Sequence, residues 1–151
     1  MKKFKFRFET VLKVKEKKEE QLKREFMQLI ALKIRQENLL MEIEKERQEK
    51  AKEKFNEKQT GTDIQTLIFY EEYTNLLRKQ IEETEKRIKE LQEKADIKRE
   101  ELIEASKQKK IFERLKQSDF NEFKNLVLKN EQQLLDEIAV NKFNRGEQKN
   151  Y

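Results

Sequence analysis

The side chains that could carry out catalysis are sparse in this sequence. Histidine and cysteine are absent, and the only serines are Ser106 and Ser118, so the usual nucleophile, base and metal ligands are missing. The glycines, Gly61 and Gly146, cannot form a glycine-rich phosphate loop. Carboxylates are abundant, but carboxylate catalysis requires a pocket that a pair of helices does not provide. We therefore expect a protein that is not an enzyme and that uses no cofactor, metal or small-molecule substrate.

The first eight residues of the chain are of types suited to binding a partner. Phe4, Phe6 and Phe8 alternate with basic residues in the segment MKKFKFRF. One interpretation is a frayed or helical lead-in whose phenylalanines pack on the other end of the chain. The other is a tip that docks into a partner, because exposed aromatic side chains are frequent binding anchors.

Basic charge is concentrated at the same end. Residues 1–24 carry ten basic and four acidic side chains. This excess suits an acidic protein groove, a phosphate backbone or an anionic membrane surface, and a solvated helix face explains it equally well.

The elements that must position these residues are two long helices. Between Leu67 and Phe112, fourteen side chains spaced alternately three and four residues apart include ten apolar ones, which is the seam of a coiled coil. A weaker stripe with polar gaps runs from Phe8 to Ile43. Proline is absent, so nothing interrupts a long helix. The seam positions are Leu67, Tyr70, Thr74, Leu77, Ile81, Thr84, Ile88, Leu91, Ala95, Lys98, Leu102, Ala105, Lys109 and Phe112.

One segment separates the two stripes. Gly61 can end a helix in the left-handed conformation, and Thr62 or Asp63 can cap the next helix. A short connection between long helices folds them back antiparallel.

We therefore predict an all-α fold: a long antiparallel two-helix coiled-coil hairpin with a longer C-terminal helix, in one domain over residues 1–151. The first arm is expected at about 8–57, the turn at about 58–63 and the second arm at about 64–145. No apolar run is long enough to span a bilayer, and the N-terminus lacks the apolar core of a secretory signal. A cytosolic location is expected.

Two groups of apolar side chains fall outside the seam. The first arm should run out opposite about residue 120, so the C-terminal overhang needs a partner surface or a second copy. The group near the turn is either a widened local core or a docking patch for another protein. The overhang carries Phe120, Phe123, Leu126, Val127, Leu134, Leu135 and Ile138. The turn group comprises Leu32, Ile34, Leu39, Ile68, Phe69, Tyr73 and Leu76.

The second half also carries short motifs of a known family. With the opening Phe4-Lys5-Phe6-Arg7-Phe8 and Leu12, they resemble the flagellar export protein FliJ family over nearly the full length, including the turn position. The motifs are Glu104-Ala105-Ser106, Lys109-Lys110, Glu113-Arg114-Leu115-Lys116, Asn130-Glu131-Gln132, Leu135-Asp136-Glu137-Ile138-Ala139 and Arg145.

The resemblance implies a central stalk of the flagellar type III export ATPase, similar to the rotor stalk of rotary ATP synthases. By this resemblance, the end with both termini enters the pore of the export ATPase hexamer and promotes the assembly and activity of the hexamer. The hinge half faces the cytoplasmic domain of the export gate, a membrane protein, and export chaperones also bind. The chain would then lie in the cytoplasm, peripherally on the cytoplasmic face of the cell membrane.

Two sets of partner-binding residues follow from these observations. Leu77 is also a seam residue, so its loss would mimic a binding defect by unfolding the hairpin, and Gln80 stands where the family pattern has a small residue. The hinge set is Leu39, Phe69, Tyr73, Leu76 and Leu77, with Tyr73 and Leu77 taken from the resemblance. The ATPase-end set is Phe4, Phe6, Phe8, Phe123, Gln132, Leu134, Asp136, Glu137 and Arg145, with Gln132, Asp136, Glu137 and Arg145 taken from the resemblance.

Two other functions fit the sequence. One is a generic coiled-coil scaffold that dimerises through the overhang. The other is a nucleic-acid or membrane-surface binder that uses residues 1–24, although nucleic acid is not the favoured partner.

Overall fold

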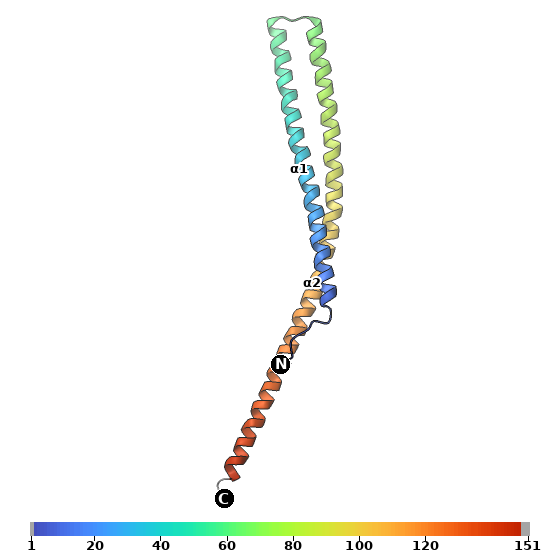
Figure 1. Cartoon of the computed structure of the whole chain (residues 1–151). Helices are drawn as coiled ribbons and strands as arrows, with labels where there is room; N and C mark the ends of the chain where they lie inside the picture. Colours follow the sequence, from blue (N-terminus) through green and yellow to red (C-terminus); the bar gives the residue numbers. More distant parts are fainter. Residues whose placement is uncertain (1, 149–151) are drawn as a thin grey trace. The chain divides into compact units, whose positions relative to one another are not determined.

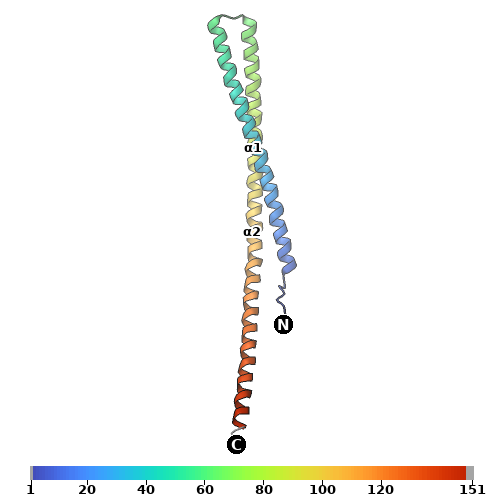
Figure 2. The ribbon, with the colours of Figure 1, turned by 60° about the vertical axis from the view of Figure 1, so that its left-hand side comes forward.

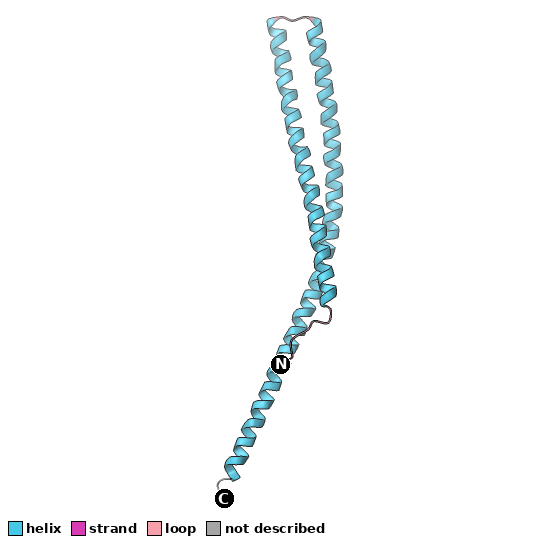
Figure 3. Cartoon of the chain, in the orientation of Figure 1, coloured by secondary structure: helices cyan, strands magenta, loops and turns pink. Residues whose placement is uncertain are grey.

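The computed structural model describes residues 2–148, which form two helices (Figures 1 and 3). Helix α1 spans Glu9–Thr60 and helix α2 spans Ile64–Gln148, and no strand occurs among the described residues. The predicted all-α hairpin with a longer second helix is confirmed. Each helix continues about three residues past its expected end, so the connection is confined to residues 61–63.

The connection has the backbone chemistry that its sequence predicts. Gly61 has a φ of 90°, which is the left-handed region that favours glycine. The Asp63 Oδ1 atom accepts a hydrogen bond of 2.9 Å from the Thr66 backbone N–H, which caps the N-terminus of α2. Hydrogen bonding by the Thr66 side chain, and then by its backbone N–H, holds the pKa of Asp63 below its ordinary value.

The chain divides into two compact units, each containing part of both helices. The hinge unit is Glu20–Glu104, and the terminal unit combines Met1–Glu19 with Ala105–Tyr151. We describe each unit separately, and a single hairpin domain over the whole chain stays a prediction.

In the hinge unit, α1 and α2 lie side by side and bury one stripe each (Figures 1 and 2). The buried apolar residues are Leu22 and Ile43 of α1 and Leu77 and Ala95 of α2, each with 8% of its surface exposed or less. Thr84 is also buried, and its hydroxyl donates a 2.7 Å hydrogen bond to the backbone oxygen of Gln80. All predicted seam positions from Leu67 to Leu102 are buried or half-buried.

Charged residues complete the seam where apolar ones are missing. Lys98 occupies a seam position, and its Nζ lies 2.8 Å from a carboxylate oxygen of Glu25 on α1. Nearer the turn, Lys54 Nζ lies 3.2 Å from Glu71 Oε2. The hydrogen bond to Glu25 raises the pKa of Lys98. These pairs let a narrow seam continue through polar sequence.

The terminal unit follows the same pattern. Leu12 is 3% exposed, and Lys109, a predicted seam residue, places its Nζ 2.9 Å from Glu19 Oε1. Near the start of α1, Lys116 Nζ lies 2.9 Å from Glu9 Oε2. Helix α1 therefore begins opposite residue 116, close to the position expected from the arm lengths. Neither helix holds, within residues 2–148, a stretch apolar enough to cross a membrane.

Replacing a buried seam leucine should lower the free energy of unfolding far more than replacing its exposed neighbour. Leu77→Ala, at a side chain 2% exposed, is expected to lower the free energy of unfolding by about 2–3 kcal/mol, because it leaves a cavity between the helices. Leu76→Ala, at a side chain 52% exposed, should cost under about 0.5 kcal/mol. Urea unfolding followed by circular dichroism measures both. Equal losses would contradict the seam assignment.

Candidate partner-binding surfaces

The N-terminal lead-in, residues 2–8, is not helical and lies on α2 within the terminal unit (Figure 1). The Phe4 ring centroid lies 5.3 Å from that of Phe120 and 5.6 Å from that of Phe123. Phe8 lies 6.1 Å from Phe112 in an edge-to-face arrangement. Packing of the phenylalanines on the other end of the chain is therefore observed, although the segment that carries them is extended and not a helix.

These contacts decide which phenylalanines are available to a partner. Phe6 is 8% exposed, so its ring is not free to act as an anchor while the lead-in stays in place. Phe4 and Phe8 are half-buried. The alternating basic residues instead face solvent, which leaves a cationic outer side on the lead-in. Its members are Lys2, Lys3, Lys5 and Arg7.

The C-terminal overhang is shorter than its sequence suggests. Phe120 and Phe123 were expected to have no cover within the chain, but Phe4 packs against both rings. The prediction is wrong for these two residues because the extended lead-in reaches farther along α2 than a helix of equal length would. Beyond Val127, every described side chain is exposed. We define the overhang from here on as residues 128–147.

The overhang holds most of the predicted ATPase-end set on a fully solvated helix. Leu134 is 58% exposed, and the Gln132 side-chain amide donates a 3.0 Å hydrogen bond to Asp136 Oδ1. Glu137 and Arg145 are exposed as well. Isolated helices draw little stability from propensity alone, because most helical stability in proteins comes from packing. A surface that covers the overhang would therefore also stabilise it.

The apolar group near the turn is exposed. Phe69 and Leu76 of α2 are 57% and 52% exposed, and Leu39 of α1 is 37% exposed. A widened local core is therefore wrong, because a pair of helices can bury only the sides that face each other. Leu77, at 2% exposed, faces the seam and presents almost nothing to a partner. Leu32, Ile34 and Ile68 of the turn group are also exposed, whereas Tyr73 is half-buried.

A groove in the hinge unit adds residues that the sequence did not single out. It has a volume of about 440 Å³ and includes Leu39 and the exposed Gln80. Its lining holds three carboxylates and one guanidinium, so its charge favours a basic or polar guest. In the sequence, the only indication of this groove is the pair Glu83 and Arg87, which are four residues apart on one helix. Their charged groups lie 3.9 Å apart in the structure. The lining is Leu39, Glu42, Ile43, Glu46, Gln80, Glu83, Thr84 and Arg87.

Tyr73 contacts both Glu46, which lines this groove, and the exposed ring of Phe69. Its hydroxyl donates a hydrogen bond to the Glu46 carboxylate across the seam, and Lys50 Nζ lies 5.5 Å from the ring centroid. Its ring stacks on Phe69 at 6.1 Å between centroids. The hydrogen bond to Glu46 raises the pKa of Tyr73.

These features define a class of protein: a helical hairpin that presents exposed apolar and charged side chains on each of its two units. Within residues 2–148, no group of three or more histidine, cysteine, aspartate or glutamate side chains is arranged to hold a metal ion. Four of the pockets in the described part of the chain are open grooves on or between the helices.

The family model of the flagellar FliJ protein matches residues 4–148, and the chain belongs to this family. Family membership makes it a component of the flagellar protein export apparatus. Comparison with curated proteins gave no match, and comparison with solved structures gave none either.

The Tyr73 hydrogen bond should be visible in a titration. A group whose folded pKa is raised contributes stability that is present at low pH and is lost as pH rises through the folded pKa. The difference in phenolate absorbance between the wild type and Tyr73→Phe should therefore titrate above the ordinary tyrosine range. Glu46→Gln should bring this titration back toward the ordinary value. A Tyr73 curve that Glu46→Gln leaves unchanged would contradict the assigned cause.

Proposed function

We propose that this chain is the central stalk of the flagellar export ATPase, with its terminal unit directed into the ATPase hexamer. The observation that carries the proposal is an overhang of exposed helix in a chain that belongs to the FliJ family over residues 4–148. A pore in a ring protein can cover all sides of a helix, which suits an overhang exposed on every side. Leu134, Leu135 and Ile138 supply its apolar contacts, at 58%, 60% and 45% exposed.

The hinge unit is proposed to meet the cytoplasmic domain of the export gate. Phe69 and Leu76 offer exposed apolar surface, and the neighbouring groove supplies carboxylates for a basic or polar segment. Tyr73 contributes its ring face, because its hydroxyl is already bonded to Glu46. Export chaperones are the third proposed class of partner, and the chain acts on the cytoplasmic face of the membrane through these proteins.

The proposed role requires that each unit keep its two helices packed together. The buried seam supports this within each unit, because the helices are packed along each other and charged pairs close the polar intervals. An isolated helix of the same composition would be marginal in water. The buried seam residues therefore maintain the fold, and the exposed residues of each unit remain available for partners.

The test is a reconstitution with the cognate export ATPase. The full chain should bind the ATPase in a pull-down and raise its rate of ATP hydrolysis. Ile138→Asp is expected to weaken both effects at least about tenfold, because it places a charge in an apolar contact. Ile97→Asp serves as the matched control, since Ile97 is 60% exposed on α2 in the hinge unit, outside the unit proposed to enter the ATPase.

Circular dichroism should show the same helicity for both variants, so that binding is compared between folded chains. A wild-type chain that neither binds the ATPase nor stimulates it overturns the proposed function. Equal loss with Ile138→Asp and Ile97→Asp would instead show that the overhang is not the contact.

A further inference from the structure

The lead-in lies on one end of an apolar stripe of α2 that continues into the overhang. The stripe consists of Phe120, Phe123, Val127, Leu134 and Ile138, which follow one another at intervals of 3, 4, 7 and 4 residues. Because an α-helix completes a turn in about 3.6 residues, these intervals keep the side chains on one face of the helix. Helix α2 is unbroken over this stretch. The five side chains therefore form one surface within the terminal unit.

Cover along this stripe changes from one end to the other. The Phe4 ring lies 5.3 Å from that of Phe120 and 5.6 Å from that of Phe123, measured between centroids. Leu134 and Ile138, at the other end, are 58% and 45% exposed. A partner that lies along the stripe from the overhang therefore meets the lead-in at Phe123.

The backbone of the lead-in is bonded to α1 and not to α2. The Phe6 carbonyl oxygen accepts a 3.3 Å hydrogen bond from the Glu9 N–H, and the Phe8 carbonyl oxygen accepts one of 2.9 Å from the Leu12 N–H. Within residues 2–148, no backbone hydrogen bond joins the lead-in to α2. A segment held on its support by side chains alone opens at a lower cost in free energy than a helix does.

The tip of the lead-in, residues 2–5, has the fewest ties. Lys2, Lys3 and Lys5 are exposed, and in the described chain none of them forms an ion pair. The ring contacts of Phe4 with α2 hold this tip. Phe6, by contrast, is only 8% exposed. The tip can therefore leave the stripe while Phe6 keeps the rest of the lead-in at the start of α1.

We propose that the lead-in is an autoinhibitory strap. In the closed state Phe4 occupies the end of the stripe formed by Phe120 and Phe123, and lifting the tip joins this end to the overhang as one continuous binding surface. The inference rests on the proposed function, because the partner that displaces Phe4 is the export ATPase. The strap and the ATPase then compete for the same rings.

This competition has a defined effect on affinity. When only the open chain offers the whole stripe, the apparent affinity for the ATPase is reduced in proportion to the open fraction. The closed strap keeps two aromatic rings from unspecific contacts until a partner supplies a matching apolar surface. Weakening the strap should therefore strengthen binding, which is the opposite of what loss of a binding residue does.

Two variants of the full chain separate the strap from the surface beneath it. Phe4→Ala should tighten binding to the hexameric ATPase about fivefold or more, because it removes two aromatic contacts of the closed state and leaves the stripe intact. Adding Phe123→Ala to Phe4→Ala should weaken binding again by about fivefold or more, because this ring then serves only the partner. Isothermal titration calorimetry measures both changes.

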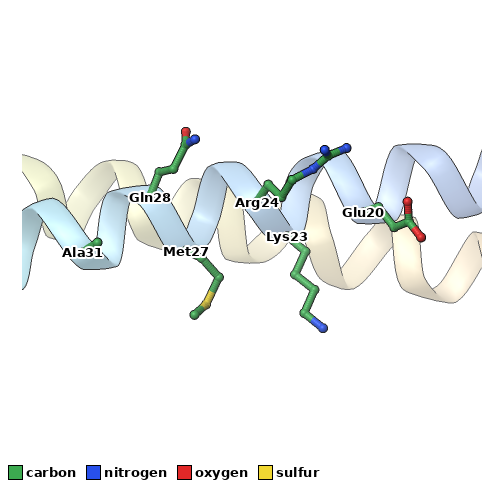
Figure 4. Close-up of a pocket in the computed structure, with 6 residues that line it drawn as sticks. All are labelled: Glu20, Lys23, Arg24, Met27, Gln28 and Ala31. Carbon is green, nitrogen blue, oxygen red and sulfur yellow. The ribbon is translucent and has the colours of Figure 1, made fainter.

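Met27→Ala is the control for loss of an apolar side chain. Met27 is 56% exposed in the hinge unit, and Figure 4 shows its side chain on the surface of α1. This variant should bind the ATPase as the wild type does. Circular dichroism should show wild-type helicity for all variants.

Trypsin cleavage of the chain alone measures the strap without the ATPase. Proteolysis tracks the population of the open form when opening is fast relative to cleavage. Cleavage after Lys3, next to Phe4, should be about fivefold or more faster in Phe4→Ala than in the wild type, as followed by mass spectrometry. Cleavage after Lys58, in the last turn of α1, is the internal reference and should keep its rate.

Several outcomes overturn the strap. Weaker ATPase binding by Phe4→Ala would show that the lead-in is part of the contact, and unchanged binding would show that it shields nothing that the ATPase uses. Unchanged cleavage after Lys3 would show that Phe4 does not hold the tip. Absence of ATPase binding by both the wild type and Phe4→Ala would instead overturn the proposed function, and the ATPase as competitor of the strap with it.

Discussion

Burial of one narrow stripe from each helix is the constraint on which the rest of this protein depends. Leu22, Ile43, Leu77 and Ala95 are among the few apolar side chains that the hinge unit removes from water, and they lie only along the line where α1 and α2 touch. A two-helix seam has no interior beyond this line. Partner recognition must therefore use the outer surfaces, where large apolar side chains remain exposed.

Charged pairs explain how a chain with 44% charged residues sustains such a long seam. Lys98 with Glu25 and Lys109 with Glu19 occupy places where apolar residues would otherwise meet. Partly exposed pairs contribute little free energy. They nevertheless disfavour other registers, because sliding one helix would leave these charges opposite apolar or like-charged neighbours. Apolar burial supplies the stability of the seam, and its polar positions favour one alignment.

The sequence by itself determined the two helices, the seam from Leu67 onward, the turn at Gly61 and the resemblance to the family, because helical periodicity and turn chemistry are local properties. Most of the apolar overhang also followed from unequal arm lengths. The tertiary structure alone decided that Phe4 packs against Phe120 and Phe123, that the turn group apart from Tyr73 is exposed, and that Glu42 and Glu83 line the hinge groove. An extended lead-in has no helical period that would show its contacts, and exposure depends on which sides of two helices face each other.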